Sequence, residues 1–174
     1  VAQHGINFMY DEGLCTADNI MTFRLTVRTV AKRHGLHATF MPKPRYGIKG
    51  SGMNLNMFLS KNGKNVFIDE QAPDGLSREA YHFMAGIIHH IKGLTLINNP
   101  IVNSYKRLVP GYNAPVEITW SRTNRTPLIR LTNVGSTNSR VVLRSPDGAS
   151  NPYLVLAGCL AAGMEGIRNE LEPP

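Results

Sequence analysis

The sequence predicts an α+β domain whose sheet is largely antiparallel. Short segments typical of β-strands outnumber the helical ones, and no regular series of crossover helices separates them. The 174 residues are enough for one domain with a buried core, and 42% of them are hydrophobic. No apolar run reaches the roughly 18–20 residues that span a bilayer, so we expect no membrane contact.

The N-terminal part is expected to hold one helix and several short strands. Apolar side chains recur at helical spacing over residues 17–34, and Gly35 is placed to end that helix. The Asn-Gly pair at 62–63 favours a tight hairpin turn. The strand-like segments of this part are residues 37–42, 53–60 and 65–69.

The C-terminal part is expected to be built from two helices with short strands between them. Ser77 opens a helix over residues 77–94, and Asn151 followed by Pro152 opens another that extends to about Asn169. The short β-type segments between these helices are residues 116–121, 127–131 and 139–144.

The net charge of +7 raises the question of a polyanion as partner. No Asp or Glu occurs between Asp18 and Asp69, where nine Lys or Arg occur, or between Glu117 and Asp147, where five Arg occur. These cations are spread through strand-like segments, and few aromatic side chains accompany them as stacking platforms for bases. The pattern therefore argues against nucleic acid and favours pockets for small anions.

The two cysteines, Cys15 and Cys159, lie far apart and lack the spacing of a metal site. Cys159 sits in an apolar run and is expected in the core. Without a disulfide framework, we expect a cytoplasmic protein. The chain begins at Val1 rather than Met, which indicates a piece of something longer.

Several segments resemble the catalytic domain of glutamine synthetases, in the order and at the spacing of that family. They are MPKPRYGIKGSGMNLN at 41–56, NPIVNSYKRLVPGYNAPVEITWS at 99–121, NRTPLIR at 124–130 and LRSPDGASNPY at 143–153. The resemblance implies a curved, largely antiparallel sheet flanked by helices. It also implies that residues 1–174 are a partial catalytic domain, without the family's N-terminal domain and extreme C-terminal segment.

The reaction implied by this resemblance is the ATP-dependent ligation of glutamate and ammonia, with ATP and Mg²⁺ or Mn²⁺ as cofactors. Arginines in such a site hold the substrate carboxylate and the transferred phosphoryl group. By position, the substrate-binding residues would be Gly50, Arg107 and Arg144. The nucleotide-binding residues would be Arg125, Arg130 and Arg140.

The residues that should bind metal are replaced. The family's Glu, His and Glu ligands correspond to Gly5, Asn54 and Val142 here, and its flap acid corresponds to Asn113. Val and Gly cannot ligate a cation, and a site that keeps its arginines but loses these ligands repels divalent ions. We therefore expect neither a metal site nor a confident catalytic residue.

Other side chains offer little compensation for these losses. Asp147 fits a structural turn ahead of Asn151, and Glu117 falls on the polar face of a strand. His89 and His90 lie mid-helix, where a structural or exposed role is the stronger interpretation.

Three hypotheses stay open. The first is a catalytically degenerate pseudoenzyme that either binds small anions, such as a glutamate-like carboxylate or a nucleotide, or serves as a regulatory or structural partner, as a homo-oligomer or with family subunits. The second is an active glutamine synthetase, or a related glutamate–amine ligase, in the full-length protein. The third is a basic interaction module.

Overall fold

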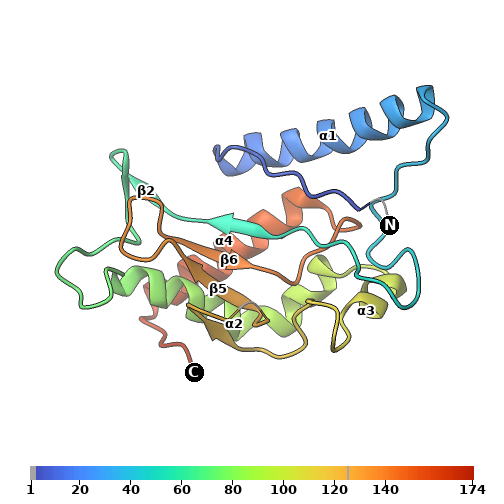
Figure 1. Cartoon of the computed structure of the whole chain (residues 1–174). Coiled ribbons are helices and arrows are strands. Elements are labelled where there is room, and N and C mark those ends of the chain that lie inside the picture. The colour runs from blue at the N-terminus through green and yellow to red at the C-terminus, as the bar shows by residue number, and fades with distance from the viewer. Residues whose placement is uncertain (1–2, 125) are drawn as a thin grey trace. The chain divides into compact units, whose positions relative to one another are not determined.

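The computed structural model describes residues 3–124 and 126–174 and divides the chain into two compact units. Residues 1–38 form the first unit and hold α1 (Gly13–Arg33), whereas residues 39–174 form the second unit and hold every other element (Figure 1). The elements of the second unit are, in chain order, β1 (Leu55–Met57), β2 (Ser60–Lys61), β3 (Lys64–Asn65), α2 (Arg78–Asn98), α3 (Val102–Arg107), β4 (Trp120–Ser121), β5 (Ile129–Thr132), β6 (Arg140–Leu143) and α4 (Pro152–Arg168).

In the first unit, α1 starts four residues before the predicted helix and ends where Gly35 was expected to end it. Gly35 has a φ of +69°, a left-handed conformation that glycine adopts without steric cost. Its amide donates to the Lys32 carbonyl at 3.1 Å, and the Leu36 amide donates to the Ala31 carbonyl at 2.9 Å. These two bonds form a Schellman motif, which satisfies the last carbonyls of the helix.

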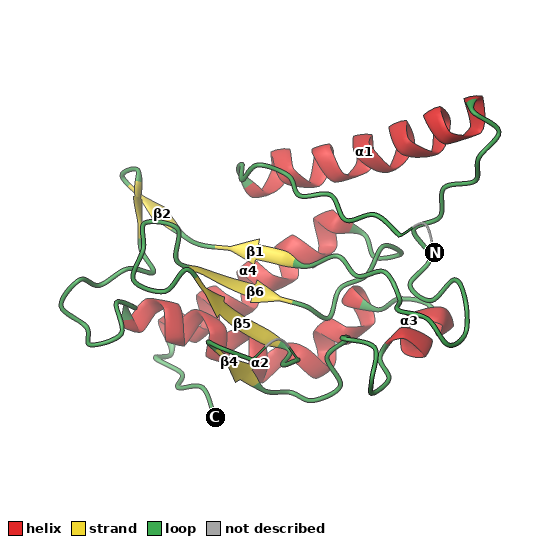
Figure 2. Cartoon of the chain, viewed as in Figure 1, coloured by secondary structure: helices red, strands yellow, loops and turns green. Residues whose placement is uncertain are grey.

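In the second unit, a four-stranded sheet has the order β1-β6-β5-β4 (Figure 2). The β1–β6 and β5–β6 pairs are antiparallel, whereas β4 and β5 run parallel. The α+β class is therefore confirmed, with a mixed sheet that is antiparallel over two of its three pairings. A separate hairpin joins β2 and β3 through Asn62 (φ +54°) and Gly63 (φ +75°), the turn that the Asn-Gly pair predicted.

The hydrophobic core lies between one face of this sheet and the helices α2 and α4. Alternate strand residues such as Ile129, Val141 and Leu143 are fully buried there, as period-two alternation requires. From the helices, Phe83 and Cys159 pack into the same cluster. The opposite face of the sheet is thus the one available for polar side chains.

Both predicted helix starts in this unit are confirmed. The Ser77 hydroxyl accepts the Ala80 amide at 3.2 Å, and the Asn151 side chain accepts the Tyr153 amide at 3.0 Å. Pro152 is the first residue of α4, where its missing N–H costs nothing.

The predicted strand at 37–42 is wrong, because its backbone bonds to loops instead of a ladder. The Pro42 carbonyl accepts the Ser51 amide at 2.8 Å, and the next residue, Lys43, donates its amide to Asn103 Oδ1 at 2.7 Å. The strand expected over 53–60 is divided between β1 and β2, and the one expected over 65–69 is displaced to Lys64–Asn65. The six-residue α3 was not predicted, since it is too short for a periodic pattern.

None of the described helices combines the length and apolar character that crossing a bilayer requires.

Candidate anion-binding site

The alternation of β6 places arginines on the sheet face opposite the core. Val141 and Leu143 point into the core, so Arg140, Val142 and the following Arg144 belong to the other face. Val142 pairs with Asn56 of β1 on one side and with Arg130 of β5 on the other. Since directly paired residues share a face, Arg130 joins this set. We call Arg130, Arg140 and Arg144 the arginine face.

Arg144 is half-buried and bonded to two backbone carbonyls. Its Nη1 donates to the Pro127 carbonyl at 3.0 Å, and its Nη2 donates to the Asn113 carbonyl at 2.5 Å. Burial, followed by the like charge of Arg130, lowers the pKa of Arg144. The side chain therefore joins the loop at Asn113 to the residues that lead into β5.

Arg130 is the arginine that β5 contributes to this face. Its Nε is buried and has no hydrogen-bond partner among the residues that the structure describes. A buried donor without an acceptor is costly. Arg140 lies two residues before Val142 on β6, and its Nε donates to the Asn138 carbonyl at 3.1 Å.

Arg107 lies at the end of α3 and is only 6% exposed. Its Nη1 donates to the Ser145 carbonyl at 2.8 Å and its Nη2 to the Arg144 carbonyl at 2.9 Å. Desolvation by burial lowers its pKa, Asp147 opposes that shift, and the charge of Arg144 adds to it. The guanidinium thus holds the chain segment that follows β6.

Two glycines make room for this side chain. A Cβ added at Gly50 would lie 3.0 Å from Arg107 Cγ, and one added at Gly52 would lie 2.4 Å from Arg107 Nη2. The turn around Gly50 and Gly52 therefore packs directly on Arg107, a reason for two glycines that the sequence analysis did not identify.

Asp147 is completely buried, and its carboxylate is used within the fold. Its Oδ1 accepts the Ala149 amide at 2.9 Å, and its Oδ2 accepts Asn99 Nδ2 at 3.0 Å. This is the Asx-type turn ahead of Asn151 that the sequence predicted.

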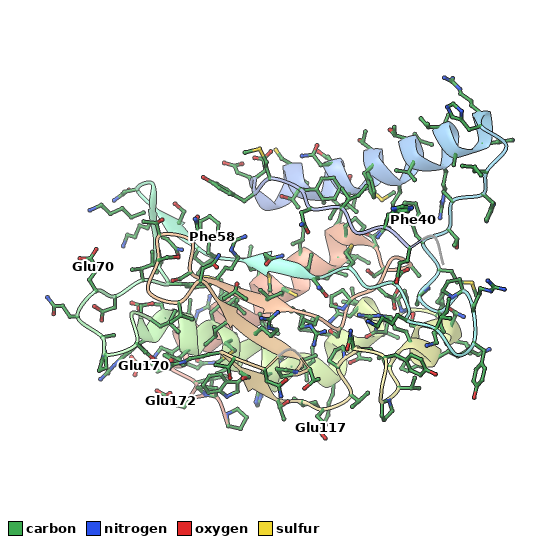
Figure 3. The ribbon with its side chains drawn as sticks, viewed as in Figure 1. Phe40, Phe58, Glu70, Glu117, Glu170 and Glu172 are labelled. Carbon is green, nitrogen blue, oxygen red and sulfur yellow. The ribbon has the colours of Figure 1, made fainter. Side chains whose placement is uncertain are left out.

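The remaining acids and histidines are dispersed. Glu117 is exposed, and Figure 3 shows it well away from Glu70, Glu170 and Glu172 at the edge of the second unit. His89 is exposed, and His90 Nε2 lies 3.1 Å from Glu165 Oε2. Within residues 3–124 and 126–174, no three His, Cys, Asp or Glu side chains are grouped as a metal site requires.

The sequence matches, over residues 1–174, the family described as "Glutamine synthetase, catalytic domain". The chain belongs to the glutamine synthetase family. It is 59% identical over 172 residues to a glutamine synthetase of Clostridium saccharobutylicum, 54% to one of Thermococcus kodakarensis and 50% to one of Methanosarcina mazei. Each comparison covers 99% of this chain but only 38–39% of the relative, so the chain spans about two fifths of the length of these curated relatives.

Glutamine synthetase membership makes a divalent metal the cofactor to test against the residues present. Val142, the residue between Arg140 and Arg144, is 5% exposed and offers only methyl groups. Asn54 is exposed and neutral, and Gly5 belongs to the first unit. Hard cations need several oxygen ligands, usually with carboxylates among them, so these residues do not fit such an ion.

Of the six residues that the family resemblance assigned to substrate and nucleotide, the structure groups some and leaves others apart. Arg130, Arg140 and Arg144 share one sheet face. Gly50 lies against Arg107, whose guanidinium bonds the carbonyls of Arg144 and Ser145 just after β6. Arg125 lies outside the described residues.

Lys43 was not predicted to belong to this region and is 8% exposed. Its Nζ lies 3.5 Å from the centre of the Tyr112 ring and also donates to the Ile48 carbonyl. A lysine between two prolines was the available signal, since such a segment is held in one conformation.

Proposed function

We propose that this glutamine synthetase family chain is catalytically degenerate and binds small anions without a divalent metal. The observation that carries the proposal is the arginine face, where Arg130 and Arg144 are close enough for one to lower the pKa of the other. Val142, on β6 between the neighbouring strands β1 and β5, is buried on this face and carries no acid group. Clustered positive charge without a carboxylate favours an anion as ligand.

The chemistry available to these residues is binding and charge stabilisation. Arg130, Arg140 and Arg144 place positive charge on one face of the sheet, which supports the binding of an oxyanion there. Asn113 is neutral and cannot take a proton from ammonium, which supports the loss of ligase chemistry. Gly50, Arg107 and Arg144 remain proposed as the substrate side of the site, and Arg125, Arg130 and Arg140 as the nucleotide side.

Calorimetry with ATP tests this proposal. We expect ATP to bind with the same dissociation constant in EDTA as in Mg²⁺ or Mn²⁺, once the concentration of free ATP is corrected for the ATP that the metal complexes. Binding that appears only with metal would contradict the proposal.

A matched pair of variants at Val142 sharpens this test. Val142→Glu places a carboxylate among the arginines and should weaken ATP binding in EDTA by roughly tenfold or more, as expected for unit charges a few ångströms apart near a protein surface. Val142→Gln has nearly the same shape without the charge and should have a much smaller effect. Equal effects of the two variants would show that shape rather than charge was lost.

The second candidate is an active glutamine synthetase or related glutamate–amine ligase in a longer protein. It is favoured by the names of the relatives, of which this chain spans about two fifths. Metal-dependent turnover of glutamate, ammonia and ATP by the whole protein, abolished by Arg125→Ala, would establish it and overturn the degenerate assignment.

We further propose a cytoplasmic protein that assembles as a homo-oligomer or with other family subunits. Two free cysteines, one exposed and one buried, are compatible with a reducing compartment. Analytical ultracentrifugation with and without a family subunit measures the assembly.

A further inference from the structure

The turn of the β2–β3 hairpin holds a chemically labile pair of residues. Asn62 is the one asparagine of the sequence that a glycine follows. Asparagine is among the thermolabile residues of proteins. It loses its side-chain amide when the backbone nitrogen of the next residue attacks its Cγ, and a glycine has no side chain to shield that nitrogen. Asn62-Gly63 is therefore the asparagine pair of this chain with the least hindered attack.

The structure leaves both reacting groups without protection. Asn62 and Gly63 are exposed, and so are the adjacent Lys61 and Lys64. Within residues 3–124 and 126–174, no hydrogen bond holds the Asn62 side chain or the Gly63 amide. The positive charges of the two neighbouring lysines favour the deprotonated nitrogen that attacks. Neither the nucleophile nor the leaving group is thus tied to another part of the fold.

The hairpin itself is short enough to open. Its strands β2 and β3 have two residues each and form a sheet of their own, apart from the four-stranded sheet (Figure 1). A two-stranded hairpin is marginally stable. Frequent local opening lets the turn sample the geometries in which the Gly63 nitrogen reaches Asn62 Cγ.

The base of the hairpin, by contrast, is anchored to the rest of the unit. Asn65 Nδ2 donates to the Ser139 carbonyl at 2.8 Å, and Asn65 Oδ1 accepts the Phe67 amide at 2.9 Å. Phe67 is completely buried in the hydrophobic core. A chemical change at the turn should therefore alter the tip and leave the core intact.

We propose that Asn62 is a site of spontaneous deamidation, which converts the turn to aspartate and isoaspartate and opens the hairpin tip. The Gly63 nitrogen loses its proton and bonds to Asn62 Cγ, the Cγ–Nδ2 bond breaks, and the amide leaves with a proton as ammonia. Water then opens the cyclic imide. Cleavage between the nitrogen and Cγ gives aspartate, whereas cleavage between the nitrogen and the main-chain carbonyl carbon gives isoaspartate. One water is consumed for each ammonia released, and nothing is oxidised or reduced.

The two products should affect the hairpin differently. Asp-Gly suits the same turn as Asn-Gly, so aspartate lowers the net charge by one and keeps the hairpin. Isoaspartate routes the main chain through Cβ and Cγ and so adds one backbone atom to the turn. A two-residue turn fixes the register of its strands, and the added atom disrupts that register. This modification is independent of the proposed anion binding.

Mass spectrometry of the folded chain tests the conversion. After incubation near neutral pH, chymotryptic peptides that contain residues 60–67 should gain the mass difference between an acid and an amide. The rate should lie within roughly tenfold of that of a synthetic peptide of residues 56–69, because a marginal hairpin gives little protection. Asn62→Gly, which keeps the positive φ but has no amide to lose, should show no gain.

Three results of this experiment would overturn the proposal. The first is a folded chain that stays unconverted while the synthetic peptide is converted. The second is a mass gain that persists in Asn62→Gly, since Asn65 lies in the same peptide. The third is aspartate without isoaspartate, which electron-transfer fragmentation distinguishes.

Hydrogen exchange tests the opening of the tip. In the isoaspartate fraction, separated by ion-exchange chromatography, the Lys64 amide should exchange roughly fivefold faster than in the unmodified chain, as expected for one lost backbone hydrogen bond. Freshly purified Asn62→Asp carries the charge without the added atom and should match the unmodified chain. The Val66 amide, bonded to the Leu59 carbonyl at 2.8 Å, should be unchanged in both. Equal Lys64 exchange in the isoaspartate fraction and in Asn62→Asp would overturn the proposed opening.

Discussion

Arg107 illustrates how a single charged side chain can be a structural element. It is 6% exposed, packs against the turn at Gly50 and Gly52, and satisfies the carbonyls of Arg144 and Ser145. Its position was predictable from the family resemblance, but its partners were not. They lie 37 and 38 residues further along the chain and meet it only in the folded state.

We expect Arg107→Met to lower the free energy of unfolding by about 2–3 kcal/mol, because two buried carbonyls would lose a charged donor. The neighbouring exposed Lys106 is the control, and Lys106→Met should change stability by no more than about 0.5 kcal/mol. Urea unfolding at neutral pH measures both variants. Unchanged stability of Arg107→Met would show that this arginine serves only a ligand.

The two cysteines should differ sharply in reactivity. Desolvation by burial raises the pKa of the Cys159 thiol to about 12, so its reactive thiolate is scarce near neutral pH, whereas Cys15 is exposed. We expect one reactive thiol per chain at pH 8 with Ellman's reagent in the folded protein and two in urea. Reaction of both thiols in the folded protein would contradict the buried position of Cys159.

Among the elements, α2 and α4 approach unusually closely because glycines meet at their crossing. A Cβ at Gly86 would lie 2.1 Å from the Ala162 carbonyl oxygen and 2.8 Å from Gly166 Cα. Both atoms belong to the backbone of α4 and cannot move aside as a flexible side chain does. The small residues of these helices therefore set the distance between them.

Gly86→Ala should destabilise the second unit by about 1–3 kcal/mol through overpacking. Gly93 on the same helix has open space around it, so Gly93→Ala should stabilise by about 0.5–1 kcal/mol through helix propensity. Thermal or urea unfolding of the two variants provides the comparison. Equal changes in the free energy of unfolding for Gly86→Ala and Gly93→Ala would mean that helix propensity rather than packing determines both effects.

A polar cluster links the residues before α2 to those after β4. Asp74 Oδ2 accepts the Tyr81 hydroxyl at 2.5 Å and also pairs with Arg122. The Tyr81 hydrogen bond first, and then the Leu76 amide and the charge of Arg122, lower the pKa of Asp74 despite partial burial. A lowered pKa in the folded state means that the ionised carboxylate stabilises the fold.

This cluster should give a defined pH dependence. The contribution of Asp74 is fully present above its ordinary pKa of 3.8 and is lost as the pH falls through the lowered value. The stability difference between wild type and Asp74→Asn should therefore be constant from pH 7 down to about pH 4 and shrink below it. Glu70→Gln, at an exposed acid, is the control, and a difference that grows on acidification would contradict the assignment.

Elements with local signals were predictable from sequence, and those defined by distant partners were not. Ser77, Asn151 and Gly35 mark helix ends through bonds to residues within five positions. Residues 37–42 have a strand-like composition but find no neighbouring strand, since their partners are side chains and turns. The parallel pairing of β4 with β5 also depends on the assembled sheet and has no signature in sequence.

For the molecule as a whole, the core belongs to one unit. Every buried residue of the main hydrophobic cluster lies between Leu55 and Ala162, within the unit formed by residues 39–174. The arginine face belongs to the same unit. Of the candidate site, the family resemblance supplied the arginine positions, but which guanidiniums bond the chain itself became visible only in three dimensions.

Residues 39–174 should fold alone. We expect a single cooperative urea transition in which circular dichroism and the fluorescence of the single tryptophan, Trp120, coincide. Transitions that separate, or an m-value far below the roughly 1–3 kcal/mol per molar usual for small domains, would show that the first unit is required.

The carbonyl bonds of Arg107 also bear on how such a chain evolves. We expect substitution of this arginine to harm folding whether or not a ligand ever binds, so selection for a folded chain is enough to preserve it. An arginine held in this way can therefore be retained by selection for folding, and its presence alone is no evidence of turnover.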